Sequence, residues 1–208
     1  MTKKKMFSRL ALAMIMALAC TSFTSCGDDT DEQNSPATWS SSYEVKFELS
    51  DDVMNTADIT AYIANPDGTF SEEKVTKSKL SWTLTGDKLP NKAGVLLTFV
   101  PKKNIDKNKV YDITINGGIT VTSYRNKGVV NHKGESGNSE MTIKGDKLAQ
   151  HYVGRGVGFA YGLSENGAIV SVDVDSFDFG LNVLWKNIAG WIKDVLNVNS
   201  KWLQKSKD

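Results

Sequence analysis

Few side chains in this sequence could perform covalent or metal chemistry. Among 208 residues there are two cysteines, Cys20 and Cys26, and two histidines, His132 and His151. Their spacing matches no zinc pattern, in which cysteine and histidine ligands come in close pairs. His132 stands in a polar, glycine-containing stretch, where a solvated histidine is expected. We therefore predict no metal ion and no cofactor.

His151 is the better candidate for acid–base catalysis. Asp146 and Ser164 are possible partners in the nearby sequence, but a catalytic triad is defined by geometry that sequence order does not show. Catalysis would require His151, a hydroxyl and a carboxylate to meet in one cleft. No pattern indicates that they do, and we predict that the protein is not an enzyme.

The glycines of residues 154–158 resemble a phosphate-binding loop only superficially. A dinucleotide loop needs GxGxxG between a strand and a helix, whereas position 159 is Phe and no parallel βαβ unit surrounds it. Glycine or alanine recurs at every second position from Gly154 to Gly162. This alternation predicts a strand with one bare face, against which another element can pack closely.

The aspartates near residue 175 do not match the pattern of a calcium-binding loop. Asp173, Asp175 and Asp178 are suitably close, but the EF-hand pattern needs Gly at its sixth position and Glu at its twelfth. Those positions hold Asp178 and Leu184. We expect these carboxylates to lie on the surface of a strand.

Glycan binding would need exposed aromatic side chains. The candidates are Trp39, Tyr62, Tyr124 and Tyr161. Each is at least as readily placed in a core, so the ligand-binding residues stay unassigned.

Residues 1–25 have the layout of a secretory signal peptide. A basic segment that ends at Arg9 precedes the apolar run Leu10 to Cys20, which is too short to span a bilayer. Phe23-Thr24-Ser25-Cys26 then resembles the lipobox of Bacteroidetes lipoproteins, with Phe in place of the commoner Leu. The resemblance implies that Cys26 is acylated and becomes the first residue of the mature chain. Cys20 is the competing acceptor, ranked second because a polar, acidic segment directly follows Cys26.

The acidic run at residues 27–32 resembles the signal that exports such lipoproteins to the outer face of the outer membrane. The alternative is a plain solvated linker, with the protein on the periplasmic face. In either case the acyl chains implied at Cys26 make the membrane a permanent partner, since each buried methylene contributes about 0.8 kcal/mol.

Charge and cysteine content limit the remaining classes. The signal segment holds four of the 25 basic residues and no acidic residue, so the chain after residue 25 has 21 basic and 24 acidic residues, a net charge of −3. This balance gives no reason to expect nucleic-acid binding. If Cys26 is lipidated, the mature domain has no thiol and no disulfide, and its core alone must stabilise it.

Short segments of alternating polarity dominate from Tyr43 onward. Period-two alternation and turn signals predict antiparallel strands. The predicted strands are residues 43–49, 57–64, 69–76, 80–84, 94–100, 110–115, 119–124, 141–144, 153–163 and 168–174. Asn116-Gly117-Gly118 predicts a hairpin turn, residues 127–138 a polar loop, and residues 148–152 a helical turn.

The chain thus divides into a signal peptide (1–25), a lipidated Cys26 with a flexible tether (26–42), a β domain (43–179) and a helix (180–208). At about 100° per residue the apolar side chains of residues 181–203 gather on one face. We expect that helix to pack on the β domain, with a partner protein or the bilayer as alternatives.

The fold class we predict is all-β: an immunoglobulin-like or related sandwich with the C-terminal amphipathic helix. The alternative is a calycin-like barrel with a C-terminal helix, which would enclose a ligand cavity. The mature domain also resembles small β-domain lipoproteins of Bacteroidetes. The predicted function is a non-catalytic, lipid-anchored binding protein for a glycan, a peptide or an envelope partner; the alternative is a carrier of a small apolar ligand.

Overall fold

The computed structural model describes residues 37–153, 155–174 and 177–179. Both cysteines, the signal peptide, Asp175 and the predicted C-terminal helix lie outside this part of the chain. None of the helices in the described residues is long and apolar enough to cross a membrane.

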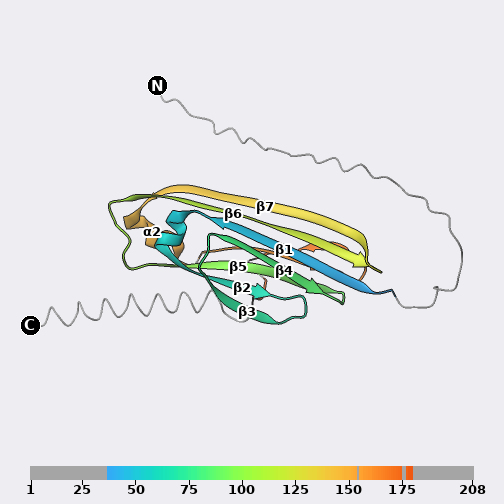
Figure 1. Cartoon of the computed structure of the whole chain (residues 1–208). Helices are drawn as coiled ribbons and strands as arrows, with labels where there is room; N and C mark the ends of the chain where they lie inside the picture. Colours follow the sequence, from blue (N-terminus) through green and yellow to red (C-terminus); the bar gives the residue numbers. More distant parts are fainter. Residues whose placement is uncertain (1–36, 154, 175–176, 180–208) are drawn as a thin grey trace, which may run out of the picture. The chain divides into compact units, whose positions relative to one another are not determined.

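Nine strands form two antiparallel sheets in the described part of the chain. The strands are β1 (Trp39–Leu49), β2 (Ala57–Ala64), β3 (Phe70–Val75), β4 (Lys79–Gly86), β5 (Asn91–Pro101), β6 (Val110–Arg125), β7 (Gly128–Lys144), β8 (Gly156–Leu163) and β9 (Ile169–Ser171). Two short helices, α1 (Asp51–Thr56) and α2 (Gly145–Tyr152), complete the fold. The strand orders are β4-β1-β6-β7 and β3-β2-β5-β8-β9. Figure 1 shows the two sheets as stacked layers, with α1 and α2 at the same end.

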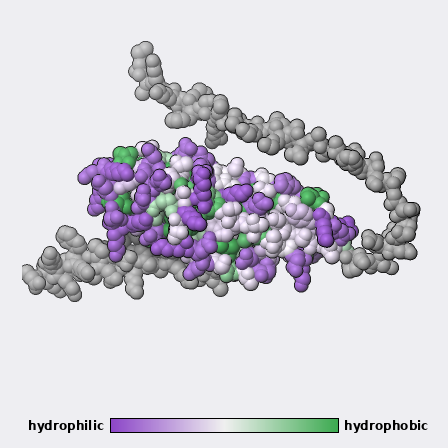
Figure 2. Space-filling view, in the orientation of Figure 1, coloured by the Kyte–Doolittle hydropathy of each residue, from purple (hydrophilic) through white to green (hydrophobic). Residues whose placement is uncertain are grey.

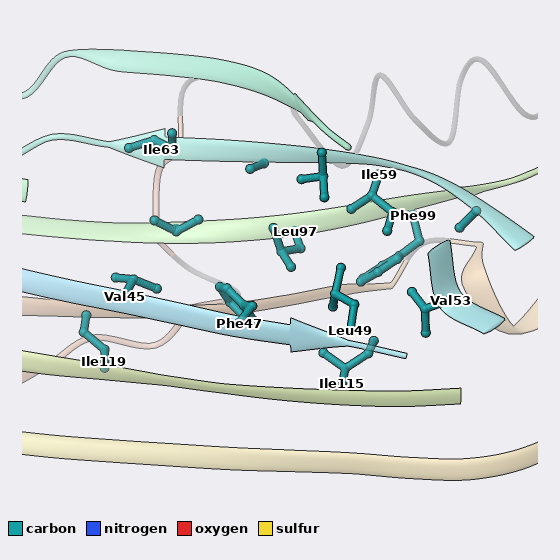
Figure 3. Close-up of a cluster of buried hydrophobic side chains, with 14 of the residues drawn as sticks. Val45, Phe47, Leu49, Val53, Ile59, Ile63, Leu97, Phe99, Ile115 and Ile119 are labelled. Carbon is teal, nitrogen blue, oxygen red and sulfur yellow. The ribbon is translucent and has the colours of Figure 1, made fainter. Parts of the chain in front are cut away.

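The two sheets pack face to face around one apolar core. Every second residue of β1 points inward, and Tyr43, Val45 and Phe47 are at most 3% exposed. Figure 3 shows Val45 and Phe47 of β1 in the layer that faces Leu97 and Ile59 of the opposite sheet. The predicted sandwich is confirmed and the barrel alternative is wrong, because the sheets remain two separate layers.

The predicted hairpin at Asn116-Gly117-Gly118 is wrong. These residues lie in the middle of β6, where Gly117 pairs with Phe47 of β1 and with Gly137 of β7. The glycine is needed for space rather than for a turn: a β-carbon on Gly117 would lie 2.7 Å from the Phe47 ring and 2.8 Å from the Phe159 ring. The actual turn is at Asn126 and Lys127, which both have positive φ.

Residues 127–138, predicted as a polar loop, instead form most of β7. This strand pairs with β6 along nearly its whole length and lies at the edge of its sheet. Most of its side chains are exposed. With polar residues on both faces, such a strand lacks the alternation that marks a half-buried one.

A pair of glycine substitutions tests why β6 contains Gly117. Gly117→Ala is expected to lower the free energy of unfolding by about 1–3 kcal/mol, as overpacking of a core does. Gly134→Ala on the neighbouring β7 is the matched control, since its β-carbon would meet only Thr120 Oγ1 at 3.8 Å. Urea unfolding should separate the two variants; equal stability would contradict the packing role of Gly117.

The structure moves the start of the β domain and adds a helix. β1 begins at Trp39, so four residues assigned to the tether belong to the sheet. Helix α1 was not predicted, although Ser50 caps it by accepting a hydrogen bond from Val53 N at 3.4 Å, and Asp51 and Asp52 suit its first turn. The helical turn predicted at residues 148–152 is confirmed within α2.

The glycine-rich strand is confirmed as β8, antiparallel to β5 and β9. Its bare face lies on the outer side of the five-stranded sheet, where Ala160 packs with Leu96, Phe177 and Phe179. Elsewhere the described surface is mostly hydrophilic or intermediate in the view of Figure 2, with hydrophobic residues in separate small areas.

Candidate functional site: a polar cleft at one end of the sandwich

A large cleft lies at the end of the sandwich away from the helices. It measures about 940 Å³ and is lined by Ser40, Ser41, Ser42, Pro66, Asp67, Thr85, Gly86, Asp87, Lys88, Pro90 and Tyr124. These residues come from the start of β1, the end of β6 and the turns that follow β2 and β4. Four separate parts of the chain therefore build one cleft.

A partly buried hydrogen-bond network beneath the cleft holds two of its lining residues, Ser41 and Lys88, in place. Tyr43 Oη donates to Asn91 Oδ1 at 2.6 Å, and Asn91 Nδ2 donates to Ser41 Oγ at 2.8 Å. Burial raises the pKa of Tyr43 far above its usual value, so the phenol stays a donor. Asn91 Nδ2 also donates to the carbonyl of Lys88 at 2.7 Å, which ties the β4–β5 loop to the sheet.

Gly86 has no side chain, which allows Pro66, Asn91 and Ser41 to approach one another closely beside the cleft. A β-carbon here would lie 2.6 Å from Asn91 Nδ2, 2.7 Å from Pro66 Cβ and 2.8 Å from Ser41 Oγ. Any larger residue would separate the two loops from β1. The turn after β2 is fixed as well, because Asp67 Oδ1 accepts hydrogen bonds from Thr69 N at 2.9 Å and Thr69 Oγ1 at 2.6 Å. These bonds lower the pKa of Asp67.

The groups that face the cleft can bind a polar, uncharged ligand. Serine and threonine hydroxyls donate and accept hydrogen bonds, and carboxylates accept them. The charged lining residues are Asp67, Asp87 and Lys88, which together carry a net charge of −1. This charge disfavours an acidic ligand. Tyr124, half-buried at the rim, offers an aromatic ring next to these polar groups.

The four aromatic candidates separate clearly in the structure. Tyr124 alone of the four lines this cleft. Trp39 lies under the Arg125 guanidinium, 5.7 Å from the ring centroid, and against Gly167. Tyr161 is buried in the core and donates a hydrogen bond to Glu135. Tyr62 lies on the outer face of the five-stranded sheet.

The structure separates His151 from Ser164, one of its two candidate partners for catalysis. His151 is in α2, whereas Ser164 lies beyond the opposite end of β8 and its hydroxyl bonds within its own turn. The pairing of His151 with Ser164 is therefore wrong. His132 lies on β7 rather than in a loop, with Nδ1 2.9 Å from Thr122 Oγ1. No group of three or more potential metal ligands occurs within the residues that the structure describes.

A second, shallower depression of about 480 Å³ crosses the outer face of the four-stranded sheet near Gly118. Its charges neutralise one another locally, since Lys79 Nζ lies 3.2 Å from Glu48 Oε1 and Lys46 Nζ 3.7 Å from Glu44 Oε2. Its one aromatic lining residue is Phe47, a buried residue of the core. The cleft of about 940 Å³ described above, called the loop-end cleft from here on, is the stronger candidate for the functional site.

Sequence reasoning missed most of the cleft. Ser40 to Ser42 were assigned to the tether, and Asp87, Lys88 and Asn91 were not singled out. The signal that could have found them is the pair of turn motifs at Asn65 to Gly68 and at Leu89-Pro90, because alternate turns of an antiparallel sandwich lie at the same end. No protein-family model and no curated protein sequence matches this chain.

Proposed function

We propose that this protein is a non-catalytic binding protein of the cell envelope, anchored through lipid on Cys26, which binds a neutral glycan in the loop-end cleft. The observation that carries the proposal is the cleft itself: about 940 Å³ lined by hydroxyls, carboxylates and one tyrosine. That volume lies within the range of about 300–1,000 Å³ typical of small-ligand sites.

The hydrogen-bond network beneath the cleft supports binding rather than catalysis. The side chain of Asn91 is hydrogen-bonded to those of Tyr43 and Ser41. These side chains therefore position the walls of the cleft and are not free to act on a ligand. A preorganised site loses less conformational entropy when a ligand binds. The location on the outer membrane, surface-exposed or on the periplasmic face, rests on the lipoprotein resemblance of the first 32 residues.

A glycan array with residues 36–208 tests the function. Saturable binding of neutral glycans is expected, and Tyr124→Ala should weaken it by about tenfold or more, equivalent to about 1.4 kcal/mol. Tyr62→Ala is the matched control, because this half-buried tyrosine lies on the outer face of the five-stranded sheet and outside the cleft. Equal losses in both variants would contradict the cleft as the site.

Absence of any glycan binding would contradict the ligand class itself. The partner would then be sought among peptides and envelope proteins, and crosslinking from Asp87→Cys in intact cells would identify it. The chain offers no competing thiol in the described domain, since both native cysteines precede residue 27.

A further inference from the structure

A smaller cavity lies at the other end of the sandwich, next to α2. It measures about 350 Å³ and is half enclosed; its lining residues are Phe99, Ile113, Ile115, Ser139, His151, Tyr152, Arg155, Gly156 and Val157. It shares no residue with the loop-end cleft. Any ligand that it takes is therefore independent of the function proposed above.

The inner wall of this cavity is apolar and lies between the two sheets, whereas Ser139, His151 and Arg155 make the rest of its lining polar. Phe99 comes from the five-stranded sheet and Ile115 from the four-stranded sheet, and Figure 3 shows them on facing layers. Phe99, Ile113 and Ile115 are each at most 7% exposed. The ring of Tyr152 closes one side, stacked on Phe99 with centroids 5.7 Å apart.

A small residue on β7 leaves the space open. Ser139 pairs with Ile115, while Met141 and Ile143 occupy the next two inward positions of the same strand and pack on the core. Ser139 is exposed, so the cavity opens to solvent past its short side chain. A larger residue here would fill the gap between β7 and β8.

The rim of the cavity carries positive charge. Arg155 is exposed, and its guanidinium takes part in none of the ion pairs found among the described residues. His151 lies beside it; burial, and then the charge of Arg155, lower the pKa of His151. The imidazole is therefore neutral at pH 7, and Arg155 alone supplies the charge at this rim.

We propose that this cavity binds a small amphiphilic carboxylate, with its hydrocarbon chain between the sheets and its carboxylate at Arg155. Arginine forms paired hydrogen bonds with a carboxylate, a geometry that a single ammonium cannot match. The volume is at the lower end of ligand sites, which favours a medium-length chain over a long one. Such a ligand differs from the wholly apolar cargo expected of a barrel, because one end of the cavity is charged and open.

Calorimetric titration of decanoate tests the proposal. The protein is the full chain with Cys26→Ala, which keeps protein-bound acyl groups out of the measurement. Saturable 1:1 binding is expected. Arg155→Gln should weaken decanoate binding about tenfold or more, as the loss of a charge-assisted hydrogen-bond pair does, and should leave the binding of neutral decanol unchanged.

Two further variants separate this site from general adsorption. Ser139→Trp should abolish binding of both ligands by filling the cavity, and an unchanged thermal midpoint would show that it folds. Arg125→Gln, at the opposite end of the sandwich, should bind as the parent does. No saturable binding, retention of binding in a folded Ser139→Trp, or equal loss in Arg125→Gln and Arg155→Gln would overturn the proposal.

Discussion

Phe47→Ala is expected to lower the free energy of unfolding by about 3–5 kcal/mol, the usual cost of deleting a buried aromatic side chain. Phe47 is 3% exposed and lies at the centre of the core. Its ring meets Trp82 edge-on at 6.2 Å between centroids and Phe159 of the opposite sheet at 5.6 Å. Truncation therefore removes contacts with both layers at once.

The loss is large relative to the total stability of a single domain, which is about 5–15 kcal/mol. The β domain begins after both cysteines, so no disulfide compensates for a weakened core. Urea unfolding measures the change as a lower midpoint with an unchanged slope. Phe70→Ala is the matched control: this phenylalanine is 47% exposed at the end of edge strand β3, and its loss is expected to change stability by about 0.5 kcal/mol or less. Similar losses in both variants would contradict the central role of Phe47.

The same inward alternation explains which strands the sequence could predict. β1 and β2 each bury one face, so their apolar residues recur at every second position and residues 57–64 are predicted to the residue. β5 is nearly all apolar because its central residues are buried on both faces. Its position in the middle of a sheet follows directly from that composition.

The error at β6 has its physical origin in core packing. Asn-Gly and Gly-Gly are strong turn signals when a strand must reverse, but glycine is equally required where two aromatic rings press against a strand. Only the positions of Phe47 and Phe159 in space distinguish these cases. The true turn at Asn126 and Lys127 puts a lysine at φ 66°, which few turn motifs would indicate.

The cleft could not be predicted because its residues share no pattern in sequence. Each turn motif marks a chain reversal, but the contact between Pro66 and Gly86 depends on how the sheets stack. Asn91 is recognisable only through its bonds to Tyr43 and Ser41, which are 48 and 50 residues away in the chain. The chemistry of the site is thus a product of topology.

The C-terminal helix stays a prediction, because residues 180–208 lie outside the described part of the chain. Phe177 and Phe179 lie against Leu96 and Ala160, so the described chain ends on the outer face of the five-stranded sheet. Lys92 Nζ lies 5.2 Å from the centroid of the Phe177 ring.

Cys26→Ala is expected to move the protein almost completely from the membrane fraction to the soluble fraction. The lipoprotein resemblance implies two or three acyl chains on Cys26, and each buried methylene contributes about 0.8 kcal/mol to membrane binding. The loss of this one residue should therefore remove the attachment, while the β domain keeps its fold because it begins 13 residues later at Trp39.

Metabolic labelling with a fatty acid, followed by ultracentrifugation of the lysate, measures both consequences. Cys20→Ala is the matched control, because Cys20 is the competing acceptor six residues earlier and should be dispensable. Retained label in Cys26→Ala together with lost label in Cys20→Ala would transfer the anchor to Cys20. Absence of label from the native protein would contradict lipid anchoring, as would a native protein found in the cytosol with its first 25 residues intact. Either result would also remove the reason to place a glycan-binding cleft in the cell envelope.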